Sequence, residues 1–184
     1  MHCPATIPLL ETPRLRLRPY VPGDAADVQR LAGDPAVART TLLIPHPYPA
    51  GAAESWIGTH AAQWATQESL VLAITLRSSG ELLGSIGLIF QVAHDKADLG
   101  YWLGVPYWNR GYTTEAVRAV LDYGFRTLGL NRIEAHYMAH NPASGRVMEK
   151  AGLQREGLIP QGVKKDGVYR DVICHGILRR DWAG

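Results

Sequence analysis

The segment that decides the fold reads YWNRGYTTEA and spans Tyr107–Ala116. An apolar, strand-like run at residues 99–105 precedes it, and an amphipathic helix pattern follows it. The turn around Arg110 and Gly111 carries no carboxylate until Glu115. A strand that enters a helix through a glycine turn leaves backbone N–H groups unpaired, and these groups attract anions, above all phosphates. The segment therefore predicts an anion-binding turn.

Gly111 alone does not identify the ligand, because many strand-to-helix connections use a glycine only to make a tight turn. The GxxxxGK[ST] string of a P-loop is absent from the chain, and so is the GxGxxG dinucleotide fingerprint. Spacing therefore excludes these two phosphate-binding loops, and the identity of the anion stays open at this point.

The elements on either side of the turn predict the fold class. Strands are expected at Leu15–Pro19, Leu70–Leu76, Leu82–Val92, Ala97–Val105, Arg132–Ala139, Leu153–Val163 and Gly167–Leu178. Helices are expected at Asp24–Gly33, Glu54–Thr66, Thr113–Leu128 and Asn141–Ala151, with a proline-rich loop at 44–51. The strands on either side of the long helix need a crossover and so run parallel, whereas hairpins join the others. The prediction is an α/β (α+β) fold with a mixed, mostly antiparallel sheet and helices on both faces.

Composition limits the classes of function. The 184 residues suit one domain, and we expect a loose N-terminal tail over residues 1–11. A net charge of +2 without a long basic run argues against a nucleic-acid partner. Cys3 and Cys174 do not suggest a disulfide framework, which favours a reducing compartment. No signal peptide or membrane-spanning run is evident, so the cytoplasm is the expected location and no membrane partner is expected.

A second informative segment reads NPASGRVMEKAGL and spans Asn141–Leu153. Asn141 is a good helix N-cap. Ser144 shares one helix face with Val147 and Met148, and a hydroxyl on an inward face needs a partner. Either it bonds a backbone carbonyl, or it points into a site.

Together, the strings WNRGYTTEA, LGLNRIEA and NPASGRVMEKAGL resemble the GCN5-related N-acetyltransferase (GNAT) superfamily, and most closely its ribosomal-protein N-terminal acetyltransferases. TPRLRLRP at 12–19, the proline loop and tryptophan helix at 46–57, and LGYWL at 99–103 extend the resemblance over residues 11–180. It implies a single-domain fold with a sheet of about seven strands, whose parallel fourth and fifth strands are splayed to admit coenzyme A. Residues 12–184 would then form one acetyl-CoA-dependent N-acetyltransferase domain.

The resemblance implies that acetyl-CoA is the co-substrate and that no metal is needed. Its pyrophosphate would lie on backbone N–H groups of Arg110, Gly111, Tyr112, Thr113 and Thr114. The pantetheine arm would pair with the strand end at Leu103, Gly104 and Val105, where a bulge is expected. Asn141 would contact the arm, and Ser144 would lie near the sulfur. The chain departs from the family signature at Trp108, where Gln or Arg is common outside this branch, and at Thr113, where Gly or Ala is usual.

Acyl transfer needs a group that takes a proton from the attacking amine. The late-hairpin glutamate proposed as the base in this branch aligns with Val163, so the resemblance implies that the chain lacks it. His136, Asp98 and Glu134 are the candidates, or water carries the proton and the enzyme supplies proximity. Ser144 is the candidate acid for the departing thiolate.

The acceptor amine stays open. A protein N-terminus and a small amine, such as an aminoglycoside, polyamine or amino acid, are both compatible with the resemblance, as is a non-catalytic acyl-CoA-binding module. Lys164 and Lys165 suit an acidic acceptor better than a polycation. Tyr169 and Asp171 match a Y-x-D pair with either a structural or a substrate-lining role. The branch often forms dimers, so a homodimer is an expected form.

Overall fold

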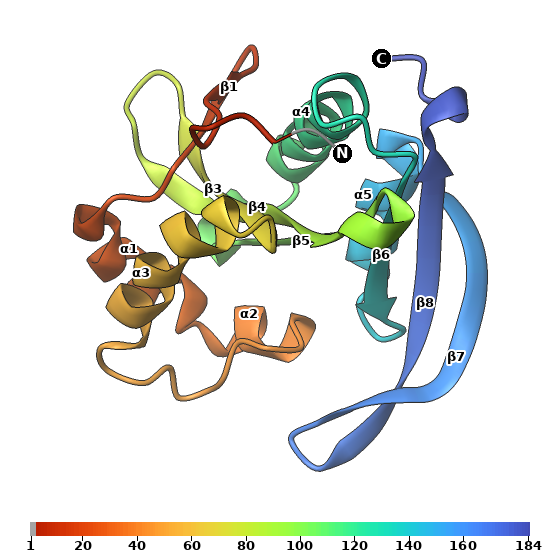
Figure 1. The fold of residues 1–184 in the computed structure, drawn as a ribbon. Coiled ribbons are helices and arrows are strands. Elements are labelled where there is room, and N and C mark those ends of the chain that lie inside the picture. Colours follow the sequence, from red (N-terminus) through yellow and green to blue (C-terminus); the bar gives the residue numbers. More distant parts are fainter. Residues whose placement is uncertain (1–2) are drawn as a thin grey trace.

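One eight-stranded sheet organises the computed structural model, which describes residues 3–184 (Figure 1). The strand order is β1-β2-β3-β4-β5-β6-β8-β7. The strands are β1 (Leu10–Glu11), β2 (Leu15–Arg18), β3 (Ser69–Leu76), β4 (Leu82–Gln91), β5 (Lys96–Leu103), β6 (Arg132–Met138), β7 (Gln154–Lys165) and β8 (Val168–Leu178). The helices are α1 (Ala25–Ala32), α2 (Pro35–Thr40), α3 (Ala52–Ala65), α4 (Tyr112–Arg126) and α5 (Pro142–Ala151).

The mixed sheet confirms the predicted fold class. β5 and β6 form the parallel pair, and the other neighbouring strands run antiparallel. Two short elements extend the prediction. Leu10 and Glu11, in the expected tail, pair with β2 as β1, and residues 1 and 2 of that tail lie outside the described residues. The six-residue α2, capped by Asp34, is too short to show a helical period in the sequence.

β5 and β6 separate beyond a short paired region, as expected. Their pairing runs from Lys96↔Arg132 to Leu99↔Ala135, yet β5 continues to Leu103 and β6 to Met138. The register between β4 and β5 has no shift, so the bulge expected near Leu103 is absent from this ladder. The strand end is therefore shaped by the separation from β6.

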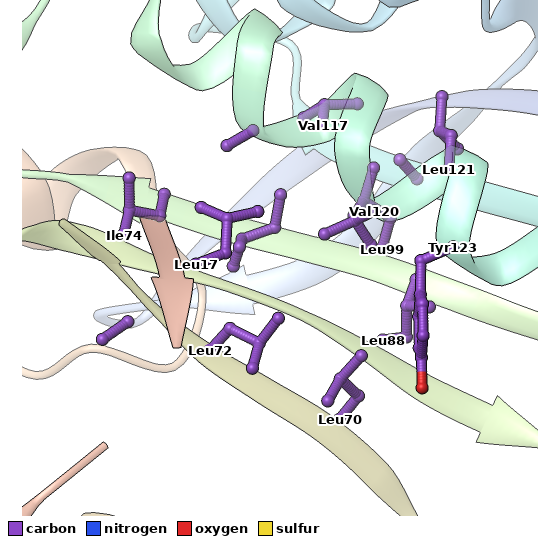
Figure 2. Packing of buried hydrophobic residues seen from close by; sticks show 14 of the residues in the cluster. Leu17, Leu70, Leu72, Ile74, Leu88, Leu99, Val117, Val120, Leu121 and Tyr123 are labelled. Atoms are coloured by element: carbon purple, nitrogen blue, oxygen red, sulfur yellow. The ribbon is translucent and has the colours of Figure 1, made fainter. Parts of the chain in front are cut away.

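Helices cover the two faces of the sheet differently (Figure 1). Figure 2 shows Val117, Val120 and Leu121 of α4 packed over apolar side chains of the central strands, among them Leu72 and Leu88. α5 lies on the same face as α4, and α1 and α3 pack on the opposite face. Between residues 3 and 184, no helix has both the length and the apolar character needed to span a membrane.

Candidate functional site

The N-terminus of α4 presents free backbone donors. Gly111 is its N-cap with φ of 78°, a left-handed conformation that favours glycine, and no side chain caps the helix there. The first helical hydrogen bond joins the Glu115 N–H to the Gly111 carbonyl at 3.1 Å. The N–H groups of Tyr112, Thr113 and Thr114 precede that bond and so lack an i→i−4 partner. All three residues line a large cavity, so their donors are available to an anion.

The carboxylate of Glu115, in the first turn of α4, is paired with two residues that precede β2. It accepts hydrogen bonds from Thr12 Oγ1 at 2.6 Å, from the Arg14 N–H at 2.9 Å and from Arg14 Nε at 2.7 Å. Burial opposes its ionisation, but these bonds outweigh burial and lower the pKa of Glu115. The Arg14 guanidinium also bonds the Arg110 carbonyl at 3.0 Å. An anion at the helix N-terminus therefore meets a paired carboxylate.

At the end of β5, the backbone carbonyl of Leu103 already accepts a hydrogen bond. Trp108 Nε1 donates to the Leu103 carbonyl at 2.7 Å, so this side chain fixes the strand end. The N–H and C=O of one strand residue point to the same side, so the Leu103 N–H also faces the open edge. Gly104 bonds β4 through its N–H, and Val105 begins a short 3₁₀ turn. Among these three predicted residues, Leu103 lines the cavity.

A cavity of about 1050 Å³ connects both faces of the sheet through the gap between β5 and β6. From the α4–α5 face it is lined by Gly111, Tyr112, Thr113, Thr114, Asn141 and Ser144. From the opposite face it is lined by Gly100 and His136 and by the apolar loop of residues 42–45. Arg110, Gly104, Val105 and Asp98, which the sequence also indicated, do not line its wall. The cavity joins an anion-binding end to an apolar mouth.

Ser144 meets a tyrosine that the sequence analysis did not single out. Its Oγ lies 2.9 Å from the Tyr101 hydroxyl, and the same phenol reaches the Ser144 carbonyl at 3.1 Å. Burial raises the pKa of Tyr101, so the phenol stays protonated at neutral pH. Asn141 occupies the N-cap position of α5, but its side chain makes no capping bond and its amide donates to Thr40 of α2 at 3.4 Å. The expected side-chain cap is therefore wrong.

His136 and Asp98 lie together on the face opposite α4 and α5. His136 Nδ1 is 3.6 Å from Asp98 Oδ1, and Gln91 Nε2 donates to the other Asp98 oxygen at 2.7 Å. Glu134 is engaged by Lys96 at 2.7 Å and Arg132 at 2.9 Å. Burial opposes its ionisation, but these bonds lower its pKa, which makes Glu134 a weak base. Of the three predicted bases, His136 alone lines the cavity.

The β7–β8 hairpin supplies an apolar part of the cavity wall and a clasp, by which we mean the hydrogen bonds from Lys165 to the loop that contains Leu42 and Ile44. Val163, at the position of the expected glutamate, lines the cavity. Lys165 Nζ, near the hairpin tip, donates to the carbonyls of Leu42 at 3.2 Å and Ile44 at 2.6 Å. The Lys164 ammonium lies 5.2 Å from the centre of the Tyr169 ring. Both lysines therefore have partners within the chain, which removes the expected reason to favour an acidic acceptor.

Two further sequence interpretations have structural outcomes. Asp171 accepts a hydrogen bond from the Gln161 N–H at 2.8 Å and so supports the irregular part of β7. Cys174 is a free, half-buried thiol, whereas the adjacent His175 is fully buried, because strand alternation places the two side chains on opposite faces of the sheet. The contacts made by Gln91, Tyr101, Arg14 and Lys165 were not predicted, because their partners lie elsewhere in the sequence.

Comparisons with known proteins place this arrangement in a family. The family model described as an acetyltransferase (GNAT) domain matches residues 14–154. N-acetyltransferase YoaA of Bacillus subtilis (strain 168) is 32% identical over 173 residues, which are 94% of this chain and 97% of that protein. The ribosomal protein uS5-alanine N-acetyltransferase of Escherichia coli (strain K12) is 34% identical over 84 residues, which are 46% of this chain and 43% of that enzyme.

The fold comparison agrees. The structure of Mycobacterium smegmatis RimJ in complex with CoA-disulfide has a TM-score of 0.87 at 24% identity and covers 100% of this chain and 93% of that one. The splayed parallel pair, the free N–H groups of α4 and the cavity between them fit the phosphate-bearing, elongated donor of this family. The chain belongs to the GNAT family of acetyltransferases, and its acetyl donor is acetyl-CoA.

Proposed function

We propose that this enzyme acetylates the N-terminal α-amino group of a protein, with a ribosomal protein as the first candidate. The observation that carries the proposal is the continuous cavity, which joins the N-terminus of α4 to a largely apolar mouth beside His136. A donor bound along the α4–α5 side and an amine that enters from the other face would meet where β5 and β6 separate.

The donor half of the proposal rests on backbone groups. The N–H groups of residues 111–114 bind the pyrophosphate, because they are free of helical bonds and the helix dipole favours negative charge there. Arg110 contributes by shaping the turn before α4. The Arg14 guanidinium holds this turn in place by donating a hydrogen bond to the Arg110 carbonyl. Residues 103–105 guide the pantetheine arm along the open edge of β5, and the Leu103 N–H polarises the thioester carbonyl. Asn141 contacts the arm from α5.

The chemical half assigns two side chains. His136 accepts a proton from the incoming ammonium, directly or through water, and Asp98 orients and stabilises the imidazolium from 3.6 Å. The neutral amine then attacks the thioester carbon. As the C–S bond breaks, Ser144 gives its proton to the CoA thiolate and is reprotonated, directly or through water, by the second proton that the nitrogen loses when the amide forms. An α-amino group, with a pKa near 8, makes the first step easier than a lysine near 10.4 does.

The acceptor assignment rests on charge and on relatives. Glu68 is the one carboxylate in the cavity lining formed by the described residues, which poorly suits a polyamine or an aminoglycoside with several ammonium groups. A relative 34% identical over part of the chain bears the name of an enzyme that acetylates ribosomal protein uS5. An acceptor with a single amine next to small or apolar groups agrees with the scarcity of carboxylates in the cavity and with the reaction that this relative is named for. We propose that the reaction takes place in the cytoplasm, where the free thiols of Cys3 and Cys174 would persist. The homodimer expected from the resemblance stays a prediction.

A thiol-release assay with acetyl-CoA tests the proposal. The acceptor panel contains peptides that copy ribosomal-protein N-termini, the same peptides with a blocked N-terminus, spermidine, an aminoglycoside and free amino acids. We expect turnover on the unblocked peptides and none on the blocked ones. Turnover confined to a small amine would contradict the protein acceptor, and CoA binding without any turnover would favour a non-catalytic module.

The base is tested by His136→Gln, with His94→Gln as the matched control because His94 does not line the cavity. We expect His136→Gln to lower kcat about 100-fold and to remove the acidic limb of the kcat/KM profile, with the KM for acetyl-CoA unchanged. An unchanged pH profile would assign the proton to water or to another group.

A further inference from the structure

Gly100 occupies a specific place in the sheet. It is the first residue of β5 beyond the last pair with β6, Leu99↔Ala135. Because Asp98 pairs with Glu134, the alternation of strand side chains puts Gly100 and His136 on the same face, next to each other across the gap. The following residue, Tyr101, reaches Ser144 on the opposite face. Both Gly100 and His136 line the cavity.

Neither backbone conformation nor packing requires a glycine at this position. Gly100 is not among the residues with positive φ. No heavy atom of residues 3–184 outside its chain neighbours lies within 4 Å of the Cβ that another residue would carry. In the adjacent strand β4, packing does require glycine. A Cβ at Gly84 would collide with the carbonyl oxygen of Trp102, and a Cβ at Gly87 would collide with that of Leu70. A glycine inside a strand costs about 0.5–1 kcal/mol relative to alanine, and often marks close approach of a ligand.

We propose that Gly100 is a specificity-determining residue: the missing side chain opens the path by which the acceptor amine reaches the thioester beside His136. This inference rests on the proposed function and deepens it. The amine passes over Gly100 from the face opposite Ser144. His136 has taken one proton from the ammonium, so the nitrogen lone pair forms the C–N bond and the C–S electron pair leaves with sulfur. Ser144 supplies the thiol proton and regains a proton, directly or through water, from the nitrogen as the amide forms.

The direction of approach follows from the layers. α4, α5 and the donor groups lie on one face, whereas Gly100 faces the side of α1 and α3. On that side the cavity wall includes the apolar residues Ile89, Val163 and Val172. A side chain at position 100 would therefore obstruct the acceptor, and would leave the N–H groups at the start of α4 untouched.

The test compares Gly100→Ala and Gly100→Val with Gly157→Ala. Gly157 is the matched control, because it is also a strand glycine with open space around its Cβ but does not line the cavity. We expect the acceptor KM to rise about 10-fold with alanine and about 100-fold with valine, and acetyl-CoA affinity to change less than twofold. Gly157→Ala keeps both constants. Thermal unfolding should show that neither alanine variant loses stability.

Unchanged acceptor KM in both Gly100 variants would overturn the inference, and so would a rise confined to acetyl-CoA, which would place Gly100 on the donor side. A wild-type enzyme that acetylates only a small amine would refute the protein acceptor, while the Gly100 comparison proceeds with that amine. Calorimetry with a conjugate of CoA and an acceptor tripeptide gives an answer without turnover. Gly100→Val should weaken the affinity for the conjugate about 10-fold or more and leave the affinity for CoA itself unchanged.

Discussion

The hydroxyl groups of Tyr101 on β5 and Ser144 on α5 lie 2.9 Å apart, although 43 residues separate them in sequence. Tyr101 stays protonated because burial raises its pKa, and its one hydrogen can be donated to the Ser144 carbonyl or to Ser144 Oγ. When the phenol donates to Oγ, the Ser144 hydrogen can point into the cavity. The pair holds the proposed proton donor in place and connects the strand that ends at Leu103 with the helix that begins at Pro142.

Ser144→Ala should lower kcat about 100-fold and leave the KM for acetyl-CoA within about twofold, because the hydroxyl acts on the departing sulfur. Tyr101→Phe should lower kcat less, since Ser144 keeps its own hydrogen. The double variant should be no slower than Ser144→Ala, because the two hydroxyls act as one unit. Steady-state kinetics of the three variants check this, and a wild-type kcat in Ser144→Ala would contradict it.

Arg14 is expected to control donor affinity through Glu115. Arg14→Ala leaves the Glu115 carboxylate with fewer partners in the first turn of α4, where it repels the pyrophosphate. The KM for acetyl-CoA should rise about fivefold, equivalent to about 1 kcal/mol, and less so at 0.5 M salt. Arg16→Ala is the control, since it removes the same charge two residues further along the chain, from an arginine that pairs with Glu11. Equal effects of both variants would assign the change to net charge alone.

Lys165 is expected to hold the loop that contains Leu42 and Ile44 against the β7–β8 hairpin, next to the proposed acceptor entrance. Its ammonium ties the β7–β8 hairpin to the Leu42 and Ile44 carbonyls, a contribution of about 1–2 kcal/mol. Lys165→Ala should therefore speed amide hydrogen exchange in residues 41–51 about 5- to 30-fold. Lys164→Ala, which removes the neighbouring charge near Tyr169, should not. If exchange rises equally in both variants, the clasp does not hold the loop.

The parts of the fold that sequence could predict are those with local causes. Gly152 adopts the left-handed conformation that its position at the C-terminal end of α5 predicts, and the Leu153 N–H bonds the Met148 carbonyl as such a cap requires. Gly111 makes the tight turn into α4 with a positive φ. The parallel pair β5–β6 followed from the length of the intervening helix. These features depend on residues within a turn or two of each other.

The parts that sequence could not predict depend on distant partners. Glu115 meets Arg14 across 101 residues, and the Asn141 amide finds Thr40 across the same separation, which is why its cap role fails. The Lys165 clasp spans more than 120 residues. Such pairs become visible only once the register of the sheet places their strands and loops together.

His60 is expected to make the fold sensitive to mild acid. It is buried on α3 between Tyr20 and Trp56, and within residues 3–184 neither ring nitrogen has a hydrogen-bond partner. Burial lowers its pKa from 6.5 to about 4. Between these values the unfolded chain binds a proton that the native protein does not, so stability is complete above pH 6.5 and falls as the pH drops towards 4, by up to about 3 kcal/mol.

Urea unfolding at pH 7.5 and pH 4.5 measures this loss, and His60→Phe should make the difference between the two pH values smaller. Phenylalanine keeps the ring packing against Trp56 but cannot take up a proton. A smaller loss should persist in His60→Phe, because burial also lowers the pKa of His175. His94→Gln, at an exposed histidine, should behave as wild type. If His60→Phe shows the full wild-type loss, the acid sensitivity comes from other groups and the buried ring is protonated in the native state.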